Sequence, residues 1–387
     1  MRRFSRLLLV AVLPLLLSNC LTIPQNPEEI TFGSWSHFKQ TFILNGRVFR
    51  PKDKNDTVSE GQAYGMIRAV LMNDRKTFDE CLAWTETFLS RKASHGDRLM
   101  AWHFENGAVS DTQSASDADI DYAYSLILAH RAWNDQRYLS LAKEVLTSVL
   151  EKETAVIHGK IYLLPWTKKG NEPEPLVTLN PSYYAPSHFK LFYEVTGDKR
   201  WQEMADTTYD LLGRLIELPV DPKEKGVVPD WVGIDQQGEI KALPGQPLVF
   251  GWDAVRVPLR IAADYYLYGD KRALEILRWF ATSYEKKFDD SCKVDLTKSK
   301  TPAEAACENA LFYSAAYAAT EAAGSSASPA ILQQIRKCIQ KNELGMFFND
   351  SNDYYINSLS WLPEYYNLIK RAGKLNAGPL TPDHSPN

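Results

Sequence analysis

The chain has 387 residues and a formal net charge of −4, with basic and acidic residues mixed along its length. This balance excludes nucleic acid as the main partner, because nucleic-acid-binding proteins gather Lys and Arg into a basic surface. Ten Trp and nineteen Tyr are more than a core of this size needs, and their flat faces suit either stacking on sugars or packing in a large interior.

Residues 1–20 have the pattern of a secretion signal. Three arginines precede an apolar run at 7–17 that is too short to span a membrane. The end of this segment, Leu17-Ser18-Asn19-Cys20, resembles a lipobox, in which Cys20 receives a lipid and becomes the first mature residue. Asn19 departs from the small residue usual before that Cys, so ordinary cleavage nearby is the alternative. We expect an exported protein, either a periplasmic or outer-membrane lipoprotein or an extracellular protein, with membrane contact only through an N-terminal lipid.

The rest of the chain has no composition break, so we expect one large domain. Residues 21–33 are interpreted as a tether, 34–371 as a single domain and 372–387 as a flexible C-terminal tail. The Cys and His residues have no metal-site spacing, and we expect no metal and no cofactor. Cys292 and Cys307 flank a polar, Lys-rich loop and either form a disulfide or remain free thiols.

Helical patterns occupy most of this domain. The first is expected at 34–43, and Asn45-Gly46 predicts a turn between short apolar runs. The next helix contains Gly61 and Gly65, each costing about 1 kcal/mol against Ala, so a neighbour is expected to approach the backbone closely there. Further helices are expected at about 76–90, 117–133, 136–152, 182–196, 198–217, 254–268, 270–286, 303–322, 328–341 and 355–371.

These helices form pairs with short internal connections, and long loops with strand-like runs such as 157–164 and 231–240 separate the pairs. The more apolar member of each pair begins near 58, 117, 182, 254, 303 and 355. Six such pairs can close into an all-α barrel of twelve helices, with the inner helices starting at one end. An open solenoid that binds protein is the competing architecture, but its repeats are usually more alike, with regular short loops.

The helix that starts near residue 117 carries acids in an otherwise apolar sequence. Ser116 is the expected N-cap, and Asp117, Asp119 and Asp121 follow it. A helix that is apolar on most faces is buried, and a charge near a core is costly unless something compensates it. These acids therefore form an elaborate cap or face a ligand, and we interpret Asp119 and Asp121 as structural.

Four blocks of this sequence, in this order, resemble those of glycoside hydrolase family 8: Ser59–Met66, Ala115–Trp133, Asn180–Tyr183 and Asp253–Pro258. Members of this family include bacterial endoglucanases and the periplasmic cellulase of cellulose-synthesis systems. The resemblance implies an (α/α)6 barrel, with long loops and short strands at the active-site end, and an inverting, endo-acting hydrolase of β-1,4-linked glucan. A β-glucan polysaccharide or oligosaccharide is then the substrate, and a cellulose-synthesis complex is a candidate partner.

The resemblance also implies roles for individual residues. The catalytic group consists of Glu60 as general acid, Asp253 as general base and Asp117 as a sugar-binding carboxylate. The substrate-binding group consists of Tyr183, which helps to hold the attacking water, Arg256, which lies near the base, and Trp102, a sugar platform. Tyr122 stands where the family usually has Ile or Met, which we interpret as repacking inside a buried helix.

The roles of Glu60 and Asp253 can also be argued from chemistry, independently of the family resemblance. Inversion at a glycosidic bond needs a protonated acid and an ionised base on opposite faces of the sugar. Glu60 lies on an apolar helical stripe, where desolvation raises a carboxyl pKa, while Asp253 lies in or beside a loop and should be more solvated. The simpler alternatives are that Glu60 only satisfies the helix dipole, and that Asp253 is an N-cap or pairs with Arg256 on the surface.

Other functions remain open on this scaffold. A xylanase or a mixed-linkage glucanase would use the same barrel, with loops 153–180 and 219–250 setting the choice. A non-catalytic glycan-binding lipoprotein would keep the barrel without the chemistry. The presence of both Glu60 and Asp253 favours an enzyme.

Overall fold

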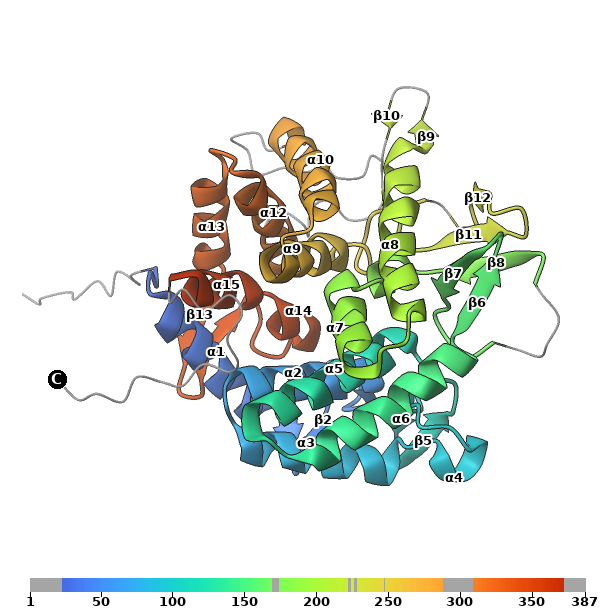
Figure 1. Ribbon diagram of the computed structural model, residues 1–387. Coiled ribbons are helices and arrows are strands. Elements are labelled where there is room, and N and C mark those ends of the chain that lie inside the picture. Colours follow the sequence, from blue (N-terminus) through green and yellow to red (C-terminus); the bar gives the residue numbers. More distant parts are fainter. Residues whose placement is uncertain are drawn as a thin grey trace, which may run out of the picture.

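The computed structural model describes residues 23–168, 174–221, 224–225, 228–246, 248–287 and 309–371 (Figure 1). The expected signal segment with Cys20, the expected tail at 372–387, and both Cys292 and Cys307 lie outside these described residues. Among the helices that are described, none combines the length and the apolar character needed to cross a membrane.

An inner ring of helices surrounds the axis of the molecule. Each inner helix packs against the next, and the last contacts the first, so the ring is closed (Figure 1). In ring order these helices are α2 (Ser59–Leu71), α5 (Ser116–Trp133), α7 (Pro186–Thr196), α9 (Arg256–Tyr268), α12 (Ala310–Ala323), and α14 (Tyr354–Leu359) followed by α15 (Leu362–Arg371).

An outer layer packs one helix against each inner position. The outer helices are α1 (Pro27–Phe42), α3 (Arg75–Phe88), α6 (Gln136–Lys152), α8 (Arg200–Glu217), α10 (Lys271–Lys287) and α13 (Ser328–Lys337), and a short helix α4 (Lys92–His95) follows α3. The chain alternates between the two layers, and α1 packs against α15, so the first outer helix covers the last inner one. The predicted (α/α)6 barrel is confirmed.

Burial explains why the two layers differ in sequence. In α12 nearly every residue from Ala310 to Thr320 is buried, because both the lumen side and the outer layer cover it. In α8 burial follows one stripe that includes Trp201, Leu211 and Leu215, and the opposite face is polar. A helix covered on most faces must be apolar on most faces, which is the distinction visible in the sequence.

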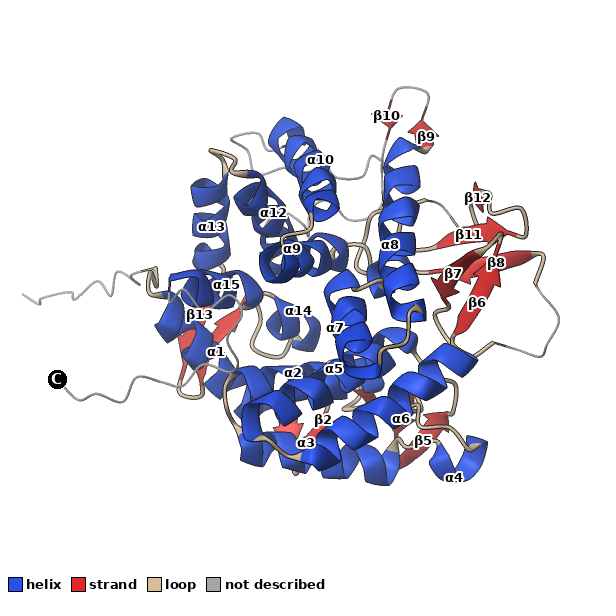
Figure 2. Cartoon of the chain, in the orientation of Figure 1, coloured by secondary structure: helices blue, strands red, loops and turns tan. Residues whose placement is uncertain are grey.

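Short antiparallel strands occupy the loops that lead into the inner helices (Figure 2). The two-stranded sheets pair β1 (Ile43–Leu44) with β2 (Arg47–Val48), β6 (Thr154–Ile157) with β7 (Lys160–Leu163), β9 (Pro219–Asp221) with β10 (Glu224–Lys225), and β13 (Ile339–Asn342) with β14 (Gly345–Phe348). The three-stranded sheets have the orders β3 (Thr57–Val58), β4 (His103–Glu105), β5 (Ala108–Asp111), and β12 (Ile240–Lys241), β11 (Val232–Asp235), β8 (Leu176–Leu179). All these strands therefore lie at the end of the barrel at which the inner helices start.

The expected close approaches are present. Asn45 and Gly46 form the turn between β1 and β2 with φ of 51° and 81°. A Cβ added at Gly61 would lie 3.1 Å from the hydroxyl of Tyr354, and one added at Gly65 would lie 2.8 Å from Val48. The two glycines thus let α14 and β2 pack tightly on α2.

The expected tether at 21–33 was wrong for most of its length, because α1 begins at Pro27 rather than at Ser34. The side chain of Asn26 accepts a hydrogen bond from the amide of Glu28 at 3.0 Å, and Pro27 occupies the first helical position. Pro at this position has no N–H to leave unpaired and a φ suited to a helix. Buried Ile30 then anchors the first turn to the barrel.

Two further boundaries differ from expectation. The helix expected at 355–371 is divided into α14 and α15, because Pro363 has no N–H to donate to the carbonyl of residue 359. The helix expected at 328–341 ends at Lys337, and the chain turns into strand β13.

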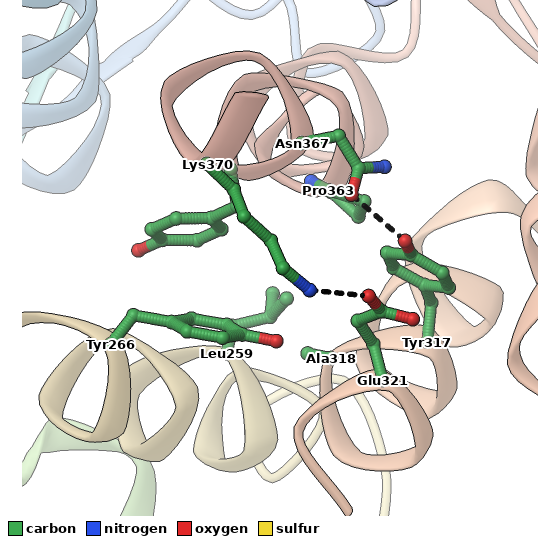
Figure 3. A pocket seen from close by; sticks show the side chains of 9 residues that line it. Leu259, Tyr266, Tyr317, Ala318, Glu321, Pro363, Asn367 and Lys370 are labelled. Atoms are coloured by element: carbon green, nitrogen blue, oxygen red, sulfur yellow. Dashed lines mark hydrogen bonds and ion pairs between the residues drawn. The ribbon is translucent and has the colours of Figure 1, made fainter. Parts of the chain in front are cut away.

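The contact between α12 and α15 closes the last part of the ring (Figure 3). The hydroxyl of Tyr317 donates to the side-chain oxygen of Asn367 at 2.9 Å, and Lys370 pairs with Glu321 at 2.9 Å. Figure 3 shows both contacts beside Leu259 and Tyr266 of α9, so three inner helices meet there.

Candidate active site

The first turns of the inner helices gather polar side chains at one end of the barrel. Glu60 lies in the first turn of α2 and Asp117 in that of α5. Arg256 is the first residue of α9, and Tyr354 is the first residue of α14. These four residues are far apart in the sequence, and closure of the ring brings them together.

Arg256 is the centre of this cluster. Its Nη1 donates to Oε2 of Glu60 at 2.6 Å and to Oδ2 of Asp117 at 2.8 Å, and its Nη2 donates to Oδ1 of Asp253 at 2.7 Å. The Arg256 side chain is only 3% exposed. One buried cation therefore faces three carboxylates, so ionisation of all three would leave excess negative charge in a poorly solvated site.

Glu60 has the environment of a protonated acid. Burial raises its pKa to about 7, and the negative charges of Asp117 and Asp253 add to this effect, while Arg256 opposes it. Its second oxygen, Oε1, lies 3.2 Å from the hydroxyl of Tyr354. The expected desolvation of Glu60 is present, but the expected apolar surroundings were wrong, because Arg256 and Tyr354 contact its two oxygens.

Asp253 lies in the turn before α9 and is the most solvated of the three carboxylates. Its side chain is 31% exposed, against 20% for Glu60 and 3% for Asp117. It is not an N-cap, since α9 begins without a side-chain cap. The alternative of a surface pair with Arg256 is also wrong, because the arginine is buried.

Asp117 is fixed at the start of α5. Its Oδ1 accepts a hydrogen bond from the amide of Ala118 at 2.9 Å while Oδ2 contacts Arg256, and burial raises its pKa. The expected N-cap role of Ser116 was wrong. Ser116 lies inside the helix, and its hydroxyl donates to the carbonyl of Leu164 at 2.5 Å, so it ties α5 to the end of β7 instead.

The structure separates the two neighbouring tyrosines, Tyr183 and Tyr184. The ring of Tyr183, at the end of the short 3-10 turn Pro181–Tyr183, has its centroid 5.2 Å from the guanidinium carbon of Arg256. Tyr184 is buried, and its hydroxyl donates to the carbonyl of Leu163 at 2.9 Å. Tyr183 therefore belongs to the cluster, and Tyr184 belongs to the core.

The three most exposed tryptophans of the described residues all lie in loops at this end. Trp102 precedes β4, and its carbonyl accepts a hydrogen bond from the amide of Ser59, next to Glu60, at 2.9 Å. Trp166 follows β7, one residue after Pro165, whose carbonyl accepts from the amide of Ser116. Trp252 directly precedes Asp253. Large apolar rings exposed beside a polar cluster indicate a binding surface.

Two more acidic groups lie close to this cluster on α5. Asp121 makes two contacts with the guanidinium of Arg260, at 2.8 and 2.9 Å, and lies 3.1 Å from His188. Asp119 accepts a hydrogen bond from the amide of Met100 at 2.8 Å and shares a hydrogen bond with Glu153. Both are held by protein groups, in agreement with the structural roles predicted for them.

Sequence reasoning missed several residues of the site. Tyr354 touches Glu60, and the hydroxyl of Tyr355 donates to the carbonyl of Trp252 at 2.7 Å. Their position at the start of an inner helix, equivalent to that of Glu60 and Asp117, is the signal that could have identified them. Trp166 and Trp252 offered no such signal, because their loops have no regular pattern.

The sequence model of Glycosyl hydrolases family 8 matches residues 6–367. The chain belongs to this family. It is 32% identical over 278 residues to an endoglucanase of Escherichia coli, an alignment that covers 70% of this chain and 73% of the relative. It is also 32% identical over 268 residues to Endoglucanase A of Acetivibrio thermocellus, covering 65% of this chain and 53% of the relative, or about half its length.

A solved structure supports the same membership. The endo-1,4-D-glucanase of Vibrio fischeri superposes with a TM-score of 0.66 at 27% identity and covers 91% of this chain and 99% of its own. The barrel and the order of the helices are therefore those of a glycosyl hydrolase of family 8.

Proposed function

We propose that this chain is an endo-1,4-β-glucanase that cleaves its substrate with inversion, using Glu60 as general acid and Asp253 as general base. The observation that carries the proposal is that one buried guanidinium, that of Arg256, holds both carboxylates at the open end of the barrel. The endoglucanase relatives support the substrate class.

Glu60 supplies the proton. With a pKa raised to about 7 it keeps its proton over much of the acidic to neutral range. Arg256 donates to Oε2 at 2.6 Å and the hydroxyl of Tyr354 donates to Oε1 at 3.2 Å, so Oε1, the more weakly bound oxygen, is proposed to carry the proton. As the glycosidic C–O bond breaks, this proton passes to the leaving oxygen.

Asp253 activates the water. Its side chain is the most exposed of the three carboxylates, which leaves room for a water molecule beside it. The carboxylate takes one proton of the water while the water oxygen attacks the anomeric carbon from the face opposite the leaving group. Tyr183, which lies against the same guanidinium, is the group proposed to help position that water.

The remaining residues bind the sugar. Asp117 presents a carboxylate fixed by Arg256 and by the Ala118 amide, a suitable acceptor for sugar hydroxyls. Trp102, Trp166 and Trp252 offer flat faces along the loops, on which successive glucose rings can stack. Exposed platforms on several loops suit binding in the middle of a polymer.

Export and lipidation at Cys20 are part of the same proposal, since a cellulose-like polymer is found outside the cytoplasm. Palmitate labelling of the full chain, beside the Cys20→Ser variant, tests this part. Label that is retained by the variant would contradict it. A cellulose-synthesis complex as partner is tested separately, by co-purification from cells that make the polymer.

The function is tested by the release of reducing ends from carboxymethyl-cellulose, mixed-linkage glucan, xylan and chitosan. We expect activity on the cellulose derivative that falls by about two to four orders of magnitude in both Glu60→Gln and Asp253→Asn. Faster release from xylan or mixed-linkage glucan would favour the alternative substrates. Folded protein that releases nothing from any of the four would favour a non-catalytic glycan-binding role.

A further inference from the structure

The turn that carries Asp253 is built on a carboxylate from another loop. Residues 252–255 form consecutive turns before α9, whose N-terminal residue has no side-chain cap of its own. The amides of this turn still need acceptors, because the first N–H groups of a helix have no partner within it.

Asp230 supplies such an acceptor. Its Oδ1 accepts hydrogen bonds from the amides of Gly251 at 2.9 Å and Ala254 at 2.7 Å, and the amide of Asp253 also stabilises its charge. The amide of Asp230 itself donates to the carbonyl of Val249 at 2.7 Å. The loop before β11 and the loop before α9 are thus tied together on both sides of Asp253.

The backbone at Gly251 lies very close to the Asp230 carboxylate. A Cβ added at Gly251 would lie 2.4 Å from Oδ2 of Asp230. Any larger residue at 251 would therefore displace the Asp230 carboxylate from its present position.

We propose that Asp230 is a positioning residue for the general base: it holds the turn 251–254 so that the Asp253 carboxylate faces Arg256 and the attacking water. This inference rests on the proposed function, since it assigns Asp230 a role through Asp253.

Asp230→Asn tests this role. In this variant the charge is lost but an amide oxygen remains as acceptor for the amides of Gly251 and Ala254. We expect KM to stay unchanged and kcat to keep most of its parental value, because the turn is still held in place.

Asp230→Ala removes the acceptor as well. We expect kcat on carboxymethyl-cellulose to fall by about 100-fold, the usual effect of displacing a reacting group by 1 Å. In the Asp253→Asn background the same substitution should cause little further loss, because both changes act through one carboxylate.

Asp235 provides a matched control. It also accepts two backbone amides, those of Gln237 at 3.0 Å and Glu239 at 2.8 Å, and it lies at the end of the neighbouring strand β11. Asp235→Ala should leave kcat unchanged. An equal loss in Asp235→Ala and Asp230→Ala, or a loss in Asp230→Asn equal to that in Asp230→Ala, would overturn the proposal.

Hydrogen exchange separates this inference from the proposed function. Amides 251–254 should exchange at least about tenfold faster in folded Asp230→Ala than in the parent, and at the parental rate in Asp235→Ala. Exchange can be measured even if the parent releases no reducing ends. In that case the proposed function would be rejected, while the role of Asp230 in holding the turn would still be supported. Unchanged exchange in Asp230→Ala would overturn the positioning even in an active enzyme.

Discussion

Arg256 and Glu60 lie 2.6 Å apart although they begin helices on opposite sides of the inner ring. A second ion pair lies one turn further along: Asp121 and Arg260 follow Asp117 and Arg256 by four residues on α5 and α9. Residues four apart share a helix face, so the two pairs are stacked and together span the lumen. The proposed catalytic cluster lies at the end of this arrangement where the inner helices begin.

Replacing Glu60 by Gln should remove the alkaline limb of the pH profile. The parental kcat/KM on carboxymethyl-cellulose should decline above about pH 7, where Glu60 loses its proton. The variant should show a much lower rate without that decline. Glu86→Gln, which affects a pair with Arg98 outside the cluster, serves as the control and should keep the parental profile. An alkaline limb retained by Glu60→Gln would assign the proton donor elsewhere.

The buried pair of Asp119 and Glu153 should make stability depend on pH. One oxygen of each carboxyl has no other partner, so the two can meet only through a shared proton. Burial raises the pKa of Glu153 to about 8, well above its value in the unfolded chain. The folded state therefore keeps a proton that the unfolded state has lost, and this contribution to stability declines between about pH 4.5 and pH 8.

Glu153→Gln removes that titration. The unfolding free energy of the variant relative to the parent should rise across this window, with a slope approaching about 1.4 kcal/mol per pH unit. Urea unfolding at pH 5, 6.5 and 8 measures it. A difference between the two proteins that stays constant with pH would show that the pair does not share a proton.

Removal of Arg260 should be costly. Arg260→Met leaves the buried carboxylate of Asp121 without its main partner, and we expect a loss of about 3–5 kcal/mol at pH 7. Arg260 lowers the pKa of Asp121, so this contribution is present above the unfolded pKa and is lost as the pH falls. The gap between parent and variant should therefore narrow below about pH 4.

Arg131→Met is the matched control for Arg260. Arg131 also joins two inner helices, through Glu194 at 2.8 Å, but both side chains are nearly half exposed. Its loss should cost less than about 1 kcal/mol. Equal destabilisation by the two substitutions in urea would mean that burial does not decide the strength of these pairs.

Trp252 should act in substrate binding rather than in stability. Trp252→Ala is expected to weaken binding of cello-oligosaccharides about tenfold, since stacking on an aromatic ring is worth about 0.5–1.5 kcal/mol beyond the area it buries. The melting temperature should change little, because the ring is 45% exposed. Phe88→Ala, at an equally exposed ring on the outer helix α3, should leave binding unchanged. Isothermal titration calorimetry with the inactive Glu60→Gln protein makes the comparison.

The fold was predictable because each inner helix has a recognisable pattern in its own sequence. An apolar helix with polar residues in its first turn, as at Glu60 and Asp117, recurs along the chain with an amphipathic partner. The errors arose where a local signal was overlooked or overridden. Asn26 and Pro27 start α1 within an apparent linker, and Pro363 breaks the last inner helix.

The site was predictable only in part. The carboxylates and Arg256 lie in recognisable blocks, but Asp230 and Trp252 reach the site through loops without periodicity. Their roles depend on contacts across the fold, such as the amides of Gly251 and Ala254 that bind Asp230. Loop residues of this kind can be assigned only when the partner segment is known.

The central claim is a single displacement in which Asp253 activates water and Glu60 protonates the leaving oxygen. Proton NMR of the first product formed from cellohexaose, recorded before mutarotation, tests it most directly. The account predicts that the α-anomer appears first, since one attack on a β-linkage inverts the anomeric carbon. Initial formation of the β-anomer would mean two displacements through a covalent intermediate and would contradict the roles assigned to Asp253 and Glu60.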